Sequence, residues 1–220
     1  MDVSLLINGK DQPATGGKLF ERRNPLSRDI ASRAAAGSTL DADAAVAAAS
    51  AALPGWSALG PNARRSLLLK AADLVQAKRD AFVAIMMAEI GTTEVWSEFN
   101  VKLAAGMLRE AASLTTQIAG EVIPSDKPGC LAMSIRQPAG VCLGIAPWNA
   151  PIILGVRAVA TALACANTVV LKASELCPGT HRLIGEVFRD AGFPPGVVNV
   201  ITNAPADAPD VVERLIANPA

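Results

Sequence analysis

Two short stretches of the chain hold polar side chains that could bind or activate a small molecule. Asn149 lies between Pro147 and Pro151, and its amide could donate a hydrogen bond to an oxyanion that develops during a reaction. Lys172 and Glu175 lie in the second stretch. The ammonium could reach ribose or phosphate oxygens, and the carboxylate could accept hydrogen bonds from ribose hydroxyls. These residue types favour a site for a nucleotide and a reacting oxygen.

Each stretch also has a purely structural interpretation. An Asn beside prolines most often forms a turn or caps a helix, and position alone favours that role for Asn149. A Lys–Glu pair is often a solvated surface pair of little energetic worth, so position alone leaves Lys172 and Glu175 open to both interpretations. The elements that carry these residues therefore matter.

Both stretches follow apolar runs that are typical of buried strands, and each run precedes a segment with helical spacing. This alternation predicts an α/β fold with a Rossmann-like parallel sheet, covered on both faces and linked by right-handed crossovers. Ligands bind beyond the carboxyl ends of such strands, which is where both stretches fall. The expected strands are residues 141–146, 168–171 and 197–201, and the expected helices begin at Pro151, at Pro178 and at Pro205 or Pro209.

The first part of the chain is expected to contain strands and turns up to residue 38, and helices beyond it. An apolar run over residues 3–7 ends at Asn8-Gly9, a strong turn signal. Composition and spacing then predict a helical region. Its helices are expected over residues 42–52 with a stop at Pro54-Gly55, from Pro61, over residues 79–90, and from Thr93 or Ser97 to Gly120.

Residues 122–138 interrupt the helical pattern, because their prolines and Gly129 prevent a helix. Leu131, Met133 and Ile135 alternate with less apolar residues, as in a half-buried strand. This solitary strand needs a partner, and we expect a protruding oligomerisation strand that pairs with another subunit. The chain is accordingly divided into a strand and helical part at 1–121, an oligomerisation arm at 122–138 and three strand–helix units at 139–220.

Composition excludes several classes of protein. The chain has 220 residues, 51% of them hydrophobic, with 20 basic and 20 acidic side chains and no Tyr. A zero net charge and few aromatics argue against nucleic-acid binding. The apolar run over residues 152–170 is too interrupted for a membrane span, and the N-terminus does not resemble a secretory signal.

The cysteines predict neither a disulfide framework nor a metal site. No CxxC pair occurs, and His181 four residues after Cys177 is a weak metal signal, so we expect no metal and reduced thiols in a cytoplasmic protein. Cys142 and Cys165 fall in an apolar strand and helix, where buried, inert thiols are usual. Cys177 is expected in an exposed loop, and His181 on the surface.

Three segments in order resemble the NAD(P)-dependent aldehyde dehydrogenase superfamily, and the helices between Asp41 and Gly120 fit it as well. The resemblance covers essentially the whole chain, but only the N-terminal half of such an enzyme. The segments are Gly144-Ile145-Ala146-Pro147-Trp148-Asn149-Ala150-Pro151, Asn167-Thr168-Val169-Val170-Leu171-Lys172-Ala173-Ser174-Glu175, and Ala191-Gly192-Phe193-Pro194-Pro195-Gly196-Val197-Val198-Asn199-Val200.

The resemblance implies a role for each matching residue. Asn149 matches the Asn that stabilises the thiohemiacetal oxyanion, while Lys172 and Glu175 match residues that contact the adenosine ribose, with Ser174 beside them. Ala173 departs from the Pro of many members, which implies a less rigid loop. Glu175 would repel a 2′-phosphate, so NAD is favoured and NADP stays an alternative. The wall along the cofactor is matched by Ile145, Ala146, Pro147 and Trp148.

The resemblance also implies the reaction. Members oxidise an aldehyde to the acid through a cysteine thiolate, with transfer of a hydride to the nicotinamide and hydrolysis assisted by a carboxylate. The nucleophile, the carboxylate and the glycine-containing pyrophosphate turn are expected after Ala220, and none of the four cysteines matches the nucleophile. We therefore expect an N-terminal portion that is inactive alone.

Substrate residues are less defined. The runs over residues 96–101 and 108–113 resemble members that act on aromatic aldehydes such as salicylaldehyde, vanillin or benzaldehyde. Trp96, Phe99 and Arg157 are the candidates for the aldehyde channel. The alternatives are that the two aromatic rings belong to the core and that Arg157 pairs with an internal Asp or Glu.

Three hypotheses follow. The first is an aromatic-aldehyde dehydrogenase portion that acts on a small aldehyde and forms a homodimer or homotetramer in its full-length form. The second is a non-catalytic nucleotide-binding or assembly module of the same fold. The third is a reductase linked to acyl-CoA or acyl-phosphate, which the Trp148-Asn149 pair disfavours.

Overall fold

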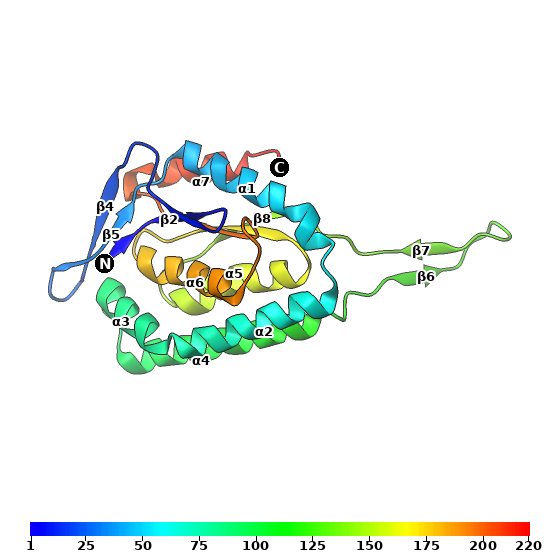
Figure 1. Ribbon diagram of the computed structural model, residues 1–220, viewed down its shortest axis with the longest axis horizontal. Helices are drawn as coiled ribbons and strands as arrows, with labels where there is room; N and C mark the ends of the chain where they lie inside the picture. Colours follow the sequence, from blue (N-terminus) through cyan, green and yellow to red (C-terminus); the bar gives the residue numbers. More distant parts are fainter.

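A five-stranded sheet lies at the centre of the computed structural model, which describes residues 1–220 (Figure 1). The strands β8, β9 and β10 run parallel, with Lys172 in register with Ile145 on one side and Ile201 on the other. The expected parallel sheet is thus confirmed. The strand order is β3 (Lys10–Gln12), β2 (Leu5–Ile7), β10 (Val198–Ile201), β9 (Thr168–Lys172) and β8 (Val141–Ile145).

Helices cover both faces of this sheet, as the apolar strands predict. Every residue of β9 is buried, because α1 (Thr39–Ser57) and α7 (Ala208–Ile216) pack on one face and α5 (Pro151–Ala164) and α6 (Pro178–Ala191) on the other (Figure 1). Pro at the first position of α5 and of α6 fits a helix start, where its missing N–H removes no hydrogen bond.

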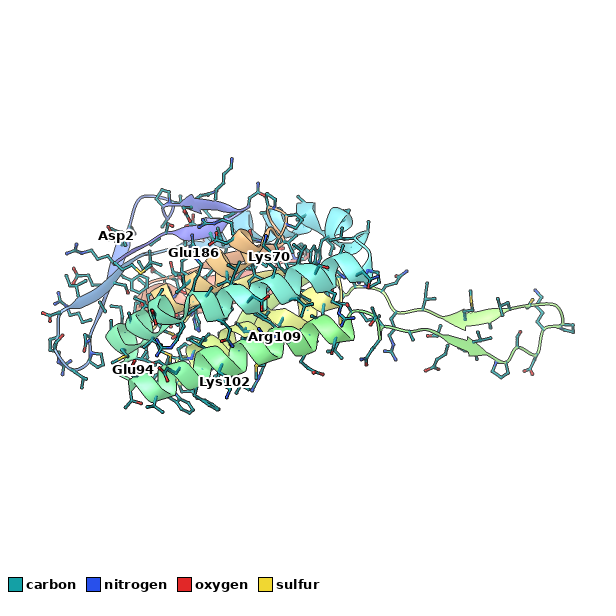
Figure 2. All side chains as sticks on the ribbon, turned by 60° about the horizontal axis from the view of Figure 1, so that its bottom comes forward. Asp2, Lys70, Glu94, Lys102, Arg109 and Glu186 are labelled. Atoms are coloured by element: carbon teal, nitrogen blue, oxygen red, sulfur yellow. The ribbon has the colours of Figure 1, made fainter.

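An outer layer of helices packs on α5 and α6. It consists of α2 (Pro61–Ala77), α3 (Arg79–Ile90) and α4 (Glu94–Leu114). Figure 2 shows Lys70 on α2 and Lys102 and Arg109 on α4 at the outer surface, and all three side chains are exposed. Each helix therefore buries one apolar stripe and presents charge on the opposite side.

The N-terminal hairpin joins the central sheet, which the local pattern did not predict. Asn8 and Gly9 both have positive φ, 53° and 72°, as the turn signal requires. β2 then pairs antiparallel with β10, and Asn8 N–H donates to Asn199 Oδ1 at 2.9 Å. A separate sheet has the order β1 (Asp2–Val3), β5 (Ile30–Ala35), β4 (Leu19–Arg23).

Two helix ends differ from the prediction. α1 continues past Pro54 to Ser57, because Trp56 is buried against Phe193, with ring centroids 5.2 Å apart, and this packing holds the last turn. α4 begins at the Thr93 cap, as expected, but ends at Leu114. Gly120 instead belongs to the arm, where a Cβ would lie 2.3 Å from the carbonyl oxygen of Ser134.

The arm is a hairpin, so the expectation of a solitary half-buried strand was wrong. β6 (Glu121–Ile123) pairs antiparallel with β7 (Ala132–Ser134), and the hairpin extends far from the rest of the molecule (Figure 1). The first strand, β6, was not predicted because it has only three residues and Pro124 follows it directly. Leu131, Met133 and Ile135 are 60–70% exposed, because nothing in this chain covers them.

Candidate functional site

The carboxyl ends of β8, β9 and β10 form one edge of the sheet. Their last residues Ile145, Lys172 and Ile201 are register neighbours, so the loops that follow the three strands lie side by side. The loop after β8 carries Asn149, and the loop after β9 carries Glu175. The topology therefore brings the polar residues of the two stretches to a single rim.

Lys172 and Glu175 form a largely buried pair, not the solvated surface pair of the structural alternative. Lys172 is 5% exposed, and its ammonium donates to Oε1 of Glu175. Asn203, in the loop after β10, donates from Nδ2 to the same Oε1 at 3.0 Å. Burial raises the pKa of Glu175, but the hydrogen bonds from Lys172, from its own backbone N–H and from Asn203 outweigh it, so the pKa lies below its ordinary value.

Sequence reasoning missed Asn203. The signal was available, since Asn203 follows the third strand just as Lys172 and Asn149 follow the others. An Asn in a loop is so common, however, that its position carries little weight by itself. Only the register of β10 beside β9 shows that it reaches Glu175.

His181 is fully buried on α6, so the expected surface position was wrong. Its Nδ1 accepts from Ser174 N–H at 3.0 Å, which puts the ring proton on Nε2, and Nε2 donates to Pro151 O at 3.1 Å. Burial lowers the pKa of His181 to about 4, so the ring is neutral. It links the loop after β9 to the start of α5, next to the Asn149 loop.

The side chain of Asn149 is exposed and makes no hydrogen bond to the protein, and the start of α5 has no side-chain cap. Asn149 therefore does not cap α5, so the capping part of the structural alternative was wrong, while its place in a bend between β8 and α5 agrees with the turn part. Ile145, Pro147 and Trp148 are also exposed, while Ala146 is buried. The residues expected along a cofactor thus present an apolar, open surface beside a free amide.

Trp96 and Phe99 lie next to this loop instead of in the core. Their rings stack with centroids 5.4 Å apart, and both are exposed. Nε1–H of Trp96 donates to the backbone oxygen of Asn149 at 3.3 Å. Asn100, buried on the next turn of α4, accepts from Ile153 N–H of α5 at 3.5 Å. These contacts fix the aromatic pair beside Asn149.

Arg157 is exposed on α5 and forms no ion pair, so the alternative of an internal carboxylate partner was wrong. The hydroxyl of Ser174 accepts from Leu176 N–H at 3.2 Å within its own buried loop. Ser174 therefore contributes to the rim by stabilising the conformation of the loop after β9.

Burial makes Cys142 and Cys177 poor nucleophiles in this chain, because it raises the pKa of both thiols. Cys177 is fully buried, contrary to the expected exposed loop, and burial raises the pKa of its thiol well above the ordinary value. Cys142 and Cys165 are half-buried, not fully buried as expected. No three His, Cys, Asp or Glu side chains gather as metal ligands, and none of the helices is both long and apolar enough to cross a bilayer.

A second buried carboxylate, which sequence reasoning missed, binds the start of α6. Glu89, at the end of α3, accepts from Ser32 Oγ at 2.7 Å, from Gly179 N–H at 2.8 Å, and from the N–H and hydroxyl of Thr180 at 2.9 and 2.8 Å. Burial raises its pKa against these hydrogen bonds. Glu89 thus satisfies the free N–H groups at the start of α6, which carries His181.

The comparisons with known proteins agree with the geometry. The model of the aldehyde dehydrogenase family matches residues 12–220. A vanillin dehydrogenase of Pseudomonas fluorescens is 63% identical over 220 residues, which are 100% of this chain and 45% of that protein. A salicylaldehyde dehydrogenase of Pseudomonas putida is 43% identical over 217 residues, 99% of this chain and 45% of that protein.

The structural comparison gives the same result. A salicylaldehyde dehydrogenase from Pseudomonas putida G7, solved in complex with salicylaldehyde, superposes with a TM-score of 0.97 at 42% identity, covering 100% of this chain and 45% of that one. A benzaldehyde dehydrogenase from Corynebacterium glutamicum, described as NAD-dependent, has a TM-score of 0.90 at 30% identity over 94% of this chain and 45% of that one. The chain spans about half the length of the relatives it matches.

Proposed function

The chain belongs to the aldehyde dehydrogenase family, and on this premise we propose that it provides the cofactor-binding half of an enzyme that oxidises an aromatic aldehyde to the carboxylic acid with NAD. The observation that carries the proposal is the shared rim of β8, β9 and β10. It brings a free amide at Asn149 and the Lys172–Glu175 pair to one edge of the sheet. The named activities of the relatives support the substrate class.

The rim fits a nicotinamide dinucleotide. The carboxylate of Glu175 and the ammonium of Lys172 would hold the adenosine ribose, with the Ser174 turn between them. Ile145, Pro147 and Trp148 give an exposed apolar wall for the rest of the cofactor. When bound, the nicotinamide supplies the hydride acceptor of the oxidation. A negative Glu175 disfavours a 2′-phosphate, which supports NAD over NADP.

Asn149 is proposed to stabilise the oxygen of the reacting aldehyde. Its amide has no partner in the protein, so its two N–H groups are available to an oxyanion without breaking a hydrogen bond. The Trp96 hydrogen bond to the backbone of the same residue restrains the loop. A preorganised donor of this kind stabilises charge that develops in the transition state more than charge already present in the substrate.

Trp96 and Phe99 are proposed to contact the aromatic ring of the substrate. They form an exposed stacked pair beside Asn149, and flat rings favour offset or edge contacts with another ring. Arg157 is proposed to receive a polar substituent, since its guanidinium has no partner in the chain.

The arm at 122–138 is proposed to join copies into a homodimer or homotetramer of a cytoplasmic protein. Residues 1–121 and 139–220 are proposed to form the cofactor-binding unit.

A non-catalytic nucleotide-binding module is the second candidate. Its support is that Cys177, the cysteine nearest to the rim in sequence, is buried with a raised pKa. The two candidates differ in turnover, not in cofactor binding.

The test uses the full-length enzyme, as its gene encodes it, with NADH formation as the readout. We expect higher kcat/KM for vanillin, salicylaldehyde or benzaldehyde than for a straight-chain aldehyde of similar size. Equal values would contradict the aromatic substrate class. The 220-residue chain alone is expected to bind NAD but to produce no NADH, and turnover by that chain would contradict the assignment of the nucleophile to another part.

A further inference from the structure

The two oxygens of the Glu175 carboxylate have different surroundings. Lys172 Nζ and Asn203 Nδ2 both donate to Oε1, and the carboxylate also accepts from the backbone N–H of Glu175 itself. No other residue of the chain donates to Oε2, and Glu175 is only partly buried. Oε2 is therefore the oxygen that remains accessible to a ligand.

Asn203 is held firmly in the position from which it reaches Glu175. Its side chain is fully buried, and Nδ2 also donates to Ala204 O at 2.9 Å. The preceding Thr202 donates from its hydroxyl to Ala35 O at 2.6 Å and accepts from Gly37 N–H at 2.9 Å. The start of the loop after β10 is thus held directly before the amide.

The orientation of the amide follows from its neighbours. If its oxygen and nitrogen exchanged places, the oxygen would face both the Glu175 carboxylate and the Ala204 carbonyl, which only donors can satisfy. The observed orientation leaves Oδ1 buried without a partner, which is unfavourable for stability. The hydrogen bond to Glu175 is the contact that the amide gains in return.

We propose that Asn203 is a positioning residue for cofactor selection, which rests on the proposed function. With Lys172 it holds Oε1, which would leave Oε2 free to accept from the ribose hydroxyls of a bound cofactor. The same fixed negative oxygen repels a phosphate on the 2′ position. Without Asn203, the carboxylate keeps only the flexible Lys172 side chain and the backbone N–H of Glu175 as donors, and it can turn away from a bound ribose.

The experiment uses the full-length enzyme. Calorimetry measures the Kd values of NAD and NADP, and steady-state kinetics measures kcat and KM. Asn203→Ala should weaken NAD binding about tenfold, the effect of losing one hydrogen bond to a charged group. NADP binding should change less, so the preference for NAD should fall. The kcat should stay within about twofold, because the reacting atoms are not touched.

Further variants separate positioning from a general structural effect. Thr202→Val removes a hydrogen bond of the same buried loop without touching Glu175, and it should lower the Tm but keep the preference for NAD. In a Glu175→Gln background, Asn203→Ala should have no further effect on the preference. Asn203→Ser tests the same loss if Asn203→Ala does not fold.

The outcomes distinguish the inference from its premise. A folded Asn203 variant that keeps the wild-type ratio of Kd values would overturn the role of Asn203, while the proposed function would stand. A wild-type protein that binds neither NAD nor NADP would overturn the proposed function. The proposal is supported if Asn203→Ala lowers the ratio of the NADP Kd to the NAD Kd, and if this effect disappears in the Glu175→Gln background.

Discussion

At the scale of single residues, Asn149 is the side chain closest to the proposed chemistry. In the full-length enzyme, Asn149→Ala should lower kcat by about 10²–10³, the usual loss when one oxyanion donor is removed. The NAD affinity should change little, because Lys172 and Glu175 are untouched. Steady-state kinetics with vanillin measures the effect, and Asn62→Ala, an exposed Asn on α2, is the matched control. An unchanged kcat under conditions where chemistry limits the rate would contradict the role.

His181 predicts how stability depends on pH. Its folded pKa of about 4 lies below the ordinary 6.5, so the folded state binds fewer protons than the unfolded state between these values. Stability is therefore complete above pH 6.5 and falls as the pH decreases toward 4. A protonated Nδ1 could also no longer accept the hydrogen bond from Ser174 N–H. The free energy of unfolding should decrease by about 2 kcal/mol between about pH 7 and pH 5.

Urea unfolding at several pH values measures this change. His181 is the single His of the chain, so a His181→Asn variant removes the whole histidine contribution. The variant should be less stable at neutral pH and should lose less stability on acidification than the wild type. Equal slopes for the two proteins would show that His181 is not the group that titrates.

The residues of the site divide into those that local sequence can predict and those that it cannot. Asn149, Lys172 and Glu175 could be proposed because each lies at or just after the end of an apolar run, and such ends are visible in the sequence pattern. His181 and Asn203 were missed because their roles depend on partners far along the chain, Pro151 and Glu175. Burial of a polar side chain results from such packing, and no local pattern records it.

At the scale of elements, Glu89 connects α3 to the start of α6. Glu89→Gln replaces one acceptor oxygen with a donor, which leaves at least one of the buried N–H or hydroxyl donors of Ser32, Gly179 and Thr180 without a partner. The expected loss is about 3 kcal/mol of unfolding free energy. Chemical denaturation measures it. Glu110→Gln, at an exposed position of α4, should change stability by less than about 0.5 kcal/mol. A similar loss in both variants would contradict the capping role.

Most elements were predictable, and the exceptions share a cause. The β8–α5–β9–α6–β10 succession follows directly from apolar runs and proline starts. The antiparallel place of β2 beside β10 depends on a pairing of Leu6 with Val200, which no local signal contains. The continuation of α1 past Pro54 depends likewise on the distant Phe193. Long-range packing overrides the local preference in each case.

At the scale of the whole molecule, the arm has an apolar face with no cover. Val122 lies opposite Met133 in the hairpin, and Leu131 and Ile135 follow on the same side by strand alternation. All four side chains are more than half exposed, on a hairpin that projects from the body (Figure 2). A two-stranded hairpin alone is marginally stable in water, so it needs a surface to pack against.

Charged substitutions on this face should therefore change assembly without changing the fold. Met133→Glu combined with Ile135→Glu should shift the protein to a smaller oligomer in light scattering after size exclusion, because burial of the arm would then bury two charges without partners. Lys127→Glu, near the tip of the hairpin and outside the paired strands, is the control and should leave the oligomer unchanged. Far-UV circular dichroism should be the same for all three proteins, since the arm contributes nothing to the central core. If the double variant kept the wild-type mass, the arm would not be the surface that joins the subunits.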